Sequence, residues 1–525
     1  MVKDSKRFAD SGGWVYAVFD YDAASISVGE PEMIKRRLST FERLKSGKLN
    51  RKQRKELMRR VFAGDPGLDV VHPNAGGIDV GNESHFAAVP PGRDAQPVQE
   101  FGCWTADLKR MAEWLIGCGV KTVVMQSTGV YWIAVYDVLQ KSGLEVWLVN
   151  ARDTRNLPGR KSDVQECQWL MKLHTYGLLR NSFRPPEEIR AVRTIWRLRD
   201  RHVKDASREI QHMQKALTTM NLQLANVFSD ISGESGQAII RAILKGERNP
   251  QKLAQLKDYR ARASEEEIAC SLEGNWQEDV IFELPQSVER YDFCQGQIRA
   301  CDRQLSKYLA ALPDRKIEPV GGTTEPGSKS AGGDGKEVPP KRRKGKRKQS
   351  RGNEPKFDLE AELTRICGVN LCTIDGVGVM TVQTWVSEIG TDMSPWPTED
   401  QLVSWLKLTP NKPISGGKVI KKGRNPDNRT KNRIATVLRT AATALDESQS
   451  YLGARYRQLR ARLDPGKAAK AMAAQLARLI YRMLTRGQEW VDRGAQEHEN
   501  RRRDRDKQFL QRRAAALGYR LEAVA

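Results

Sequence analysis

Two carboxylates that could act in phosphoryl transfer follow a turn at Pro158-Gly159. Asp163 and Glu166 lie three residues apart at the start of an expected helix, so both side chains point to one helical face. Arg160 and Lys161, just before them, could contact a phosphate, and carboxylate oxygens are the ligands that hard divalent cations prefer. The same acids could instead be solvated residues of a first helical turn, where they complement the helix dipole.

Two further oxygen donors come from short apolar segments upstream. Asp79 lies in the expected strand that ends near Gly81, and Gln126 ends the apolar run that precedes a glycine turn. Further expected elements are a strand at 85–89, helices at 105–118 and 130–142, and a strand at 145–149.

This alternation of strands and helices predicts an α/β layered domain. The carboxyl ends of its strands would share one edge, so we expect Asp79 and Gln126 to lie there with Asp163 and Glu166. The four side chains predict a metal-dependent phosphoryl-transfer site.

The composition favours a nucleic-acid partner. The 525 residues carry a formal net charge of +23, which suits a polyanion. No apolar run approaches the roughly 20 residues of a membrane span, and the polar N-terminus has no signal-peptide core, so we expect a cytoplasmic protein. The eight cysteines form no CxxC pair, which favours reduced, buried thiols over zinc or disulfides.

A heptad pattern dominates the middle of the chain. Apolar residues recur at alternating steps of three and four from Ile189 to Val227, with Arg199 the single break, and residues 291–312 repeat the rhythm. This periodicity predicts a coiled coil, formed by the two stretches within one chain or with another copy.

Basic and glycine-rich segments separate the folded parts. Residues 35–60 and 341–351 are rich in Lys and Arg, and either could contact phosphates or serve as a solvated surface or tether. Segment 313–356 has the composition of a disordered linker. Beyond it, Gly376 and Gly378 precede a helix expected at 379–389 and resemble a helix-hairpin-helix turn, which presents backbone N–H groups to phosphate.

A serine lies in a cationic, glycine-rich segment of this second part. Ser415 is followed by two glycines in a loop that we expect to be flexible, ahead of a helix at about 428–445. The glycines leave its hydroxyl open to approach, although a Ser-Gly-Gly segment can equally be a simple turn. Nearby cations that could attract a nucleic-acid backbone are Lys418, Lys421, Lys422, Arg424 and Arg429.

Together these motifs resemble a known family. Segments 70–81, 125–132, 158–173 and 371–418 look like the insertion-sequence transposases of the one-ten family, in particular its one-eleven-eleven branch, which is related to the pilin-inversion invertase. The similarity spans residues 69–185 and 358–495.

The resemblance implies an α/β RNase H-like (RuvC-like) domain, a coiled coil and a mainly α-helical transposase domain with a catalytic serine. It also implies Mg²⁺ or Mn²⁺ as the cofactor. The implied partners are donor DNA, target DNA and a structured bridge RNA. The resemblance further implies homo-oligomers, from dimer to tetramer, in which residues of two chains form each site. Such a protein would associate with the bacterial nucleoid. The expected organisation is a basic extension (1–68), the RuvC-like domain (69–186), a coiled-coil and helical domain (187–312), a basic linker (313–356), the serine transposase domain (357–495) and a basic tail (496–525).

Carried onto this sequence, the family's acidic tetrad falls on Asp79, Gln126, Asp163 and Glu166, and its nucleophile on Ser415. Gln126 stands where a glutamate is expected and Glu166 where an aspartate is expected. A glutamine can offer a carbonyl oxygen to Mg²⁺ but removes a negative charge.

Two other functions remain open on the sequence alone. A hydrolytic RuvC-like nuclease or junction resolvase would use the acids and leave Ser415 as a turn residue. A non-catalytic nucleic-acid-binding relative would bind RNA and DNA without breaking strands.

Overall fold

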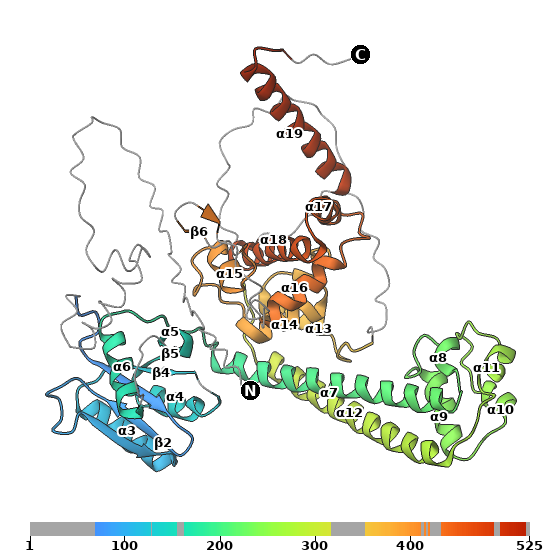
Figure 1. Cartoon of the computed structure of the whole chain (residues 1–525), viewed down its shortest axis with the longest axis horizontal. Helices are drawn as coiled ribbons and strands as arrows, with labels where there is room; N and C mark the ends of the chain where they lie inside the picture. Colours follow the sequence, from blue (N-terminus) through green and yellow to red (C-terminus); the bar gives the residue numbers. More distant parts are fainter. Residues whose placement is uncertain are drawn as a thin grey trace, which may run out of the picture. The chain divides into compact units, whose positions relative to one another are not determined.

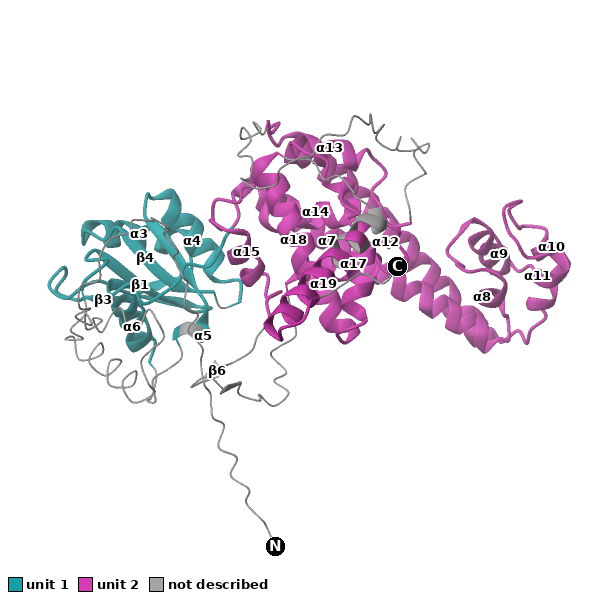
Figure 2. Ribbon diagram, turned by 90° about the horizontal axis from the view of Figure 1, so that it is seen from above, with its two compact units in different colours: residues 1–184 teal, residues 185–525 magenta. Residues whose placement is uncertain are grey.

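The structure is a computed structural model that describes residues 69–127, 129–154, 162–316, 352–410, 414–415, 418–419, 432–487 and 494–520. The chain divides into two compact units between Arg184 and Pro185 (Figure 2). The predicted basic extension and most of the predicted linker lie outside the described residues. No helix among the described ranges is long and apolar enough to cross a membrane.

The first unit is built on a five-stranded mixed sheet with the strand order β3-β2-β1-β4-β5. β1 pairs antiparallel with β2, which pairs antiparallel with β3, whereas β1, β4 and β5 run parallel. This arrangement is consistent with an RNase H-like core. The strands are β1 (Ala75–Val80), β2 (Ser84–Ala88), β3 (Val98–Gly102), β4 (Thr122–Gln126) and β5 (Glu145–Val149).

Helices cover both faces of this sheet (Figure 1). α3 (Thr105–Gly117) and α4 (Trp132–Lys141) share a buried cluster with Ile78 of β1 and Met125 of β4. On the other face α6 (Asp163–Thr175) contributes Trp169 and Leu170 to a cluster with residues of β4 and β5. A four-residue helix, α5 (Ala151–Thr154), follows β5. Because successive side chains of a strand alternate between faces, residues 77 and 79 of β1 lie on the α6 face.

The second unit begins with two long helices that lie side by side, α7 (Glu187–Thr219) and α12 (Glu278–Ala310) (Figures 1 and 2). Thus the two stretches with heptad spacing pair within the chain. Arg199, the break in the pattern, is 2% exposed, and its Nε donates to Asp302 Oδ1 of α12 at 2.5 Å. A buried guanidinium needs such a carboxylate partner, which explains why a charge is tolerated at this apolar position.

The predicted heptad run to Val227 is too long, because α7 ends at Thr219. Asn221 has a left-handed φ of 56°, which no helix interior accommodates, and residues 224–227 form a separate short helix. Beyond α7 a small helical cap closes around its own buried core, to which the last turns of α7 and the first of α12 contribute. The cap helices are α8 (Leu224–Val227), α9 (Glu234–Leu244), α10 (Pro250–Ala254) and α11 (Glu265–Ser271).

The remaining helices form the other end of this unit. The base of α7 is tied to α14, because the Arg197 guanidinium donates to both Glu388 carboxylate oxygens, at 2.9 and 2.6 Å, and Trp196 Nε1 donates to Thr384 Oγ1 at 3.2 Å. The predicted helix at 379–389 coincides with α14. The elements are α13 (Leu359–Cys367), η1 (Leu371–Thr373), α14 (Val379–Ile389), α15 (Glu399–Trp405), β6 (Ile414–Ser415), β7 (Lys418–Val419), α16 (Arg433–Thr443), α17 (Tyr451–Arg460), α18 (Pro465–Arg486) and α19 (Gly494–Ala516).

Candidate active site

Asp79 and Gln126 lie at the carboxyl ends of two neighbouring parallel strands. The register pairs Ile78 of β1 with Met125 of β4, so the next residues along the strands, Asp79 and Gln126, are also neighbours. Both belong to the face covered by α6, because their preceding neighbours pack on the α3 and α4 side. Gln126 is only 7% exposed. The sheet thus presents one carboxylate and one carboxamide together at the edge where α/β folds bind ligands.

The first turn of α6 supplies the two other acids. Ser162 caps this helix, since its Oγ accepts a hydrogen bond from the Gln165 backbone N–H at 3.3 Å. Asp163 and Glu166 therefore occupy the first turn, where the positive end of the helix dipole stabilises carboxylates. Their spacing of three residues places them on one face of the helix, as the sequence predicts.

Gly77 allows α6 to lie directly on β1. A Cβ built at Gly77 would stand 2.3 Å from the Cys167 carbonyl oxygen and 2.4 Å from the Met171 nitrogen, both backbone atoms of α6. No side chain larger than hydrogen fits there without moving the helix. This close approach sets how near the acids of α6 stand to the strand ends.

One acid of the helix, Glu166, contacts a strand residue. Gln126 Nε2 donates to Glu166 Oε1 at 2.5 Å, which joins the end of β4 to the first turn of α6. Cys167, fully buried in the next position of the helix, has its pKa raised to about 12, chiefly by burial and further by the negative charges of Asp79 and Asp163. Both charges therefore lie near enough to Cys167 to act on its thiol.

The donor set fits a hard divalent cation by ligand chemistry. Asp79, Asp163 and Glu166 offer carboxylate oxygens, and Gln126 offers an amide oxygen. Among the described residues, no three acidic, histidine or cysteine side chains stand close enough together to hold a metal ion. One oxygen of Glu166 accepts a hydrogen bond from the Gln126 amide. This hydrogen bond holds the Glu166 carboxylate at the end of β4.

Ser415 belongs to the second unit and lies in a strand. The sequence predicts a flexible loop here, whereas β6 pairs antiparallel with β7 so that Ser415 stands opposite Lys418. The sequence contains a signal for this pairing that our loop prediction overlooked, because two glycines between short segments favour a tight hairpin. The side chains of both residues lie outside the described part of the structure. So do the residues Arg160, Lys161, Lys421, Lys422, Arg424 and Arg429.

The two glycines of the predicted helix-hairpin-helix turn differ in their surroundings. Gly376 has a φ of 80°, and a Cβ there would stand 2.8 Å from the Ala441 carbonyl oxygen of α16, so this glycine serves packing as well as the turn. Gly378 caps α14, is exposed and has no atom within 4 Å of its missing Cβ. Of the two, Gly378 is the one whose neighbourhood leaves room for a phosphate at a helix start.

Two family models match the chain. Residues 76–222 match the DEDD transposase model of IS110, and residues 369–457 match the model described as the transposase IS116/IS110/IS902 family. The first match contains Asp79, Gln126, Asp163 and Glu166, and the second contains Ser415. A search of curated proteins gives no match.

Proposed function

Because this chain belongs to the IS110 family of transposases, we propose that it cuts donor and target DNA and rejoins the strands through a covalent bond to Ser415. The observation that supports the proposal is the hydrogen bond between Gln126 of β4 and Glu166 of α6, which joins the first turn of α6 to the sheet edge near which Asp79 of β1 lies. A site of carboxylates on this framework suits phosphoryl transfer.

In the proposed reaction the Ser415 hydroxyl oxygen attacks a phosphorus atom of the DNA backbone. A bond forms between phosphorus and Oγ, the bond to one strand oxygen breaks, the serine proton passes to an acceptor, and the departing oxygen gains a proton. A hydroxyl at another strand end then attacks the phosphoserine and releases Ser415. The phosphoserine bond conserves the energy of the cut strand, so rejoining needs no ATP.

Asp79, Asp163 and Glu166 are the residues that would hold Mg²⁺ or Mn²⁺, with Gln126 as a neutral fourth donor or as the group that orients Glu166. When bound, such an ion would polarise the phosphate and stabilise the departing oxygen. The amide of Gln126 supports this arrangement without adding a charge, because a carboxylate in its place would repel Glu166 across 2.5 Å.

We further propose that base pairing to a structured bridge RNA selects the DNA sites, so that the protein contacts shape and backbone. The net charge of +23 supports both nucleic-acid partners. The pairing of α7 with α12 supports a coiled coil within each chain. We propose that dimers and tetramers form through this pair of helices.

A strand-cleavage assay tests the acidic site. The full-length protein, with RNA that co-purifies, is incubated with labelled donor and target DNA in the presence of Mg²⁺ or EDTA. We expect cleavage only with Mg²⁺, and a loss of at least about tenfold in Glu166→Gln. Glu113→Gln, an exposed change on α3, is the matched control and should cleave like wild type. Equal cleavage by the Glu166→Gln variant, or in EDTA, would contradict the assignment of the site.

A further inference from the structure

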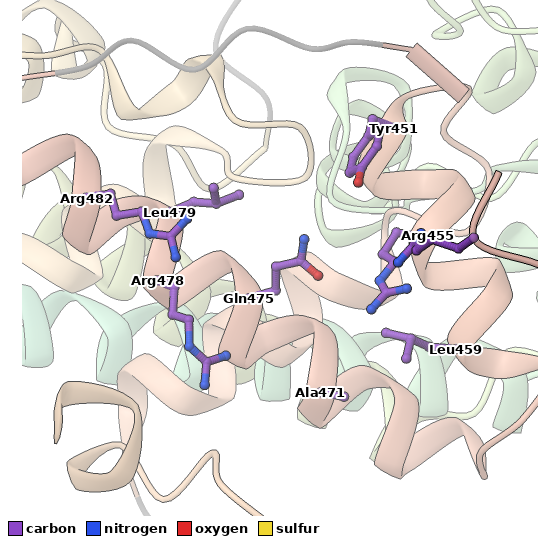
Figure 3. A pocket seen from close by; sticks show the side chains of 9 residues that line it. Tyr451, Arg455, Leu459, Ala471, Gln475, Arg478, Leu479 and Arg482 are labelled. Carbon is purple, nitrogen blue, oxygen red and sulfur yellow. The ribbon is translucent and has the colours of Figure 1, made fainter. Parts of the chain in front are cut away.

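Three basic side chains of α18 pair with nearby carboxylates. Two of them, Arg478 and Arg482, are among the side chains that line the pocket in Figure 3. Lys470 of the same helix has no carboxylate partner in the part of the chain that the structure describes. The three pairs are Lys467 with Asp464 at 2.5 Å, Arg478 with Asp400 at 2.8 Å, and Arg482 with Glu399 at 2.5 Å.

Lys470 is half-buried and contacts the start of the segment that carries Ser415. Its Nζ donates to the Thr409 carbonyl oxygen at 3.0 Å, and Thr409 precedes Ser415 by six residues in the chain. An ammonium group has three N–H donors, and the Thr409 carbonyl accepts one of them. A partly buried charge costs free energy unless an opposite charge accompanies it. We therefore expect an anion to bind at Lys470.

A second cation, Arg439 of α16, lies near Lys470. α16 and α18 pack against each other, and the positive charge of Arg439 adds to the burial that lowers the pKa of Lys470. Arg439 is exposed and forms no ion pair with the described residues. Two like charges that stand together without a carboxylate repel each other, and a bound anion would remove this repulsion.

The sequence between Thr409 and α16 shows which anion fits. The basic residues of segment 411–431 are Lys412, Lys418, Lys421, Lys422, Arg424, Arg429 and Lys431, and its one acid is Asp427. This composition attracts a polyanion and offers few carboxylates to neutralise neighbouring cations. Lysine and arginine donors form charge-assisted hydrogen bonds with phosphate oxygens. A nucleic-acid phosphate is therefore the anion that suits Lys470 and Arg439.

We propose that Lys470 and Arg439 together bind one backbone phosphate of the DNA, at the start of the segment that carries Ser415. The proposal rests on the proposed function, because attack by Ser415 requires DNA at this segment. Lys470 would contact both the chain and its substrate, since Thr409 accepts one of its N–H donors and the phosphate accepts another. The two cations would hold the DNA strand without taking part in the exchange of bonds.

Binding of donor DNA to the full-length protein in EDTA tests the two cations without strand cleavage. A fluorescent donor duplex is titrated with the protein and its co-purifying RNA, and anisotropy is recorded over a series of salt concentrations. The double variant Lys470→Met with Arg439→Gln should lower the slope of log affinity against log salt by about 0.9, the contribution of one duplex phosphate. The same variant should weaken binding at low salt by about fivefold or more.

Matched variants separate the phosphate contact from general electrostatics and from the contact with Thr409. Lys467→Met with Arg462→Gln removes the same two types of charge at exposed positions, and it should change the slope by less than about half as much. Arg439→Gln alone keeps the hydrogen bond between Lys470 and Thr409, so a loss of affinity in this variant reports the phosphate. Thermal unfolding of each variant establishes that it folds.

The proposal is overturned if wild type does not bind the duplex, or if the folded double variant binds it with wild-type affinity and slope. It is also overturned if Lys470→Met weakens binding and Arg439→Gln does not, because the contact with Thr409 would then explain the loss. Absorbance measures the RNA that each variant retains, and a loss of RNA in the double variant would overturn the assignment to DNA.

Formation of the Ser415 adduct is measured separately with Mg²⁺. Binding that depends on Lys470 and Arg439 in a protein that forms no adduct would remove only the proposed reaction. An adduct in wild type, together with unaltered binding in the double variant, would remove only the phosphate site.

Discussion

Replacing Gly77 by alanine should displace α6 from the sheet and disable the acidic site. The added Cβ would stand 2.3 Å from the Cys167 carbonyl oxygen, about 1 Å closer than the 3.4 Å at which ordinary van der Waals contact begins. The obstructing atoms are backbone, so a rotamer change cannot relieve the clash and the helix must shift by about this distance. Overpacking of this kind costs roughly 1–3 kcal/mol of unfolding free energy.

The same shift should separate Glu166 from Gln126 and carry Asp163 away from the strand ends. A misplacement of about 1 Å at a reacting centre can cost about a hundredfold in rate. We therefore expect Gly77→Ala to lower the thermal midpoint of the first unit by about 5 °C or more and to lower strand cleavage by about a hundredfold. Differential scanning fluorimetry and the cleavage assay measure the two effects.

Gly117→Ala is the matched control, because no atom lies within 4 Å of the Cβ that it would add at the end of α3. This change should leave cleavage unaltered and leave the midpoint equal or slightly higher, since alanine restricts the unfolded chain. A Gly77→Ala variant that unfolds and cleaves like wild type would refute the reasoning that this glycine positions α6.

Three further predictions concern buried polar contacts. Gln126→Glu loses a hydrogen bond to a charged group, worth about 1.5–3 kcal/mol, and adds repulsion with Glu166. The midpoint of thermal unfolding in EDTA should therefore fall, and Mg²⁺ should restore part of the loss. An unchanged midpoint would contradict the contact between the two side chains. Burial lowers the pKa of His174 from 6.5 to about 4, so the unfolded chain binds a proton on this ring at higher pH than the folded protein does. About 3 kcal/mol of unfolding free energy that is present above pH 6.5 should therefore be lost as the pH falls toward 4. An NMR titration of the ring with a midpoint near 6.5 would contradict this prediction. Asp302→Ala should lower the free energy of unfolding, measured in urea, by about 3–5 kcal/mol, because it leaves Arg199 buried without its carboxylate partner. The double variant Arg199→Met with Asp302→Leu should recover most of this loss. Equal losses in the two variants would show that the unpaired charge is not the cause.

Local patterns predict much of the first unit. The strand expected at 145–149 coincides with β5, and strong alternation of apolar segments and glycine turns located the other parallel strands. Asp163 and Glu166 could be placed on a helix start because the turn at Pro158-Gly159 and two acids suited to a first helical turn are local signals. The close approach at Gly77 could not be derived, since it depends on which helix covers which strand.

Long-range contacts account for most of what the sequence did not predict. Arg199 interrupts an apolar pattern, and its partner Asp302 lies 103 positions away in α12, so no local signal connects them. The cap helices α9, α10 and α11 are short and owe their stability to a shared core. The hairpin at Ser415 was overlooked because flexible glycines favour both a loop and a tight turn.

A covalent-trapping experiment tests the central claim most directly. The full-length protein, with co-purifying RNA and Mg²⁺, is incubated with a nicked, labelled donor DNA, and protein–DNA adducts are separated on a denaturing gel. Ser404→Ala, an exposed serine of α15, is the control for Ser415→Ala. We expect the adduct in wild type and in Ser404→Ala, and its loss in Ser415→Ala. Cut DNA without an adduct in wild type, or an adduct that persists in Ser415→Ala, would contradict a phosphoserine intermediate at this residue.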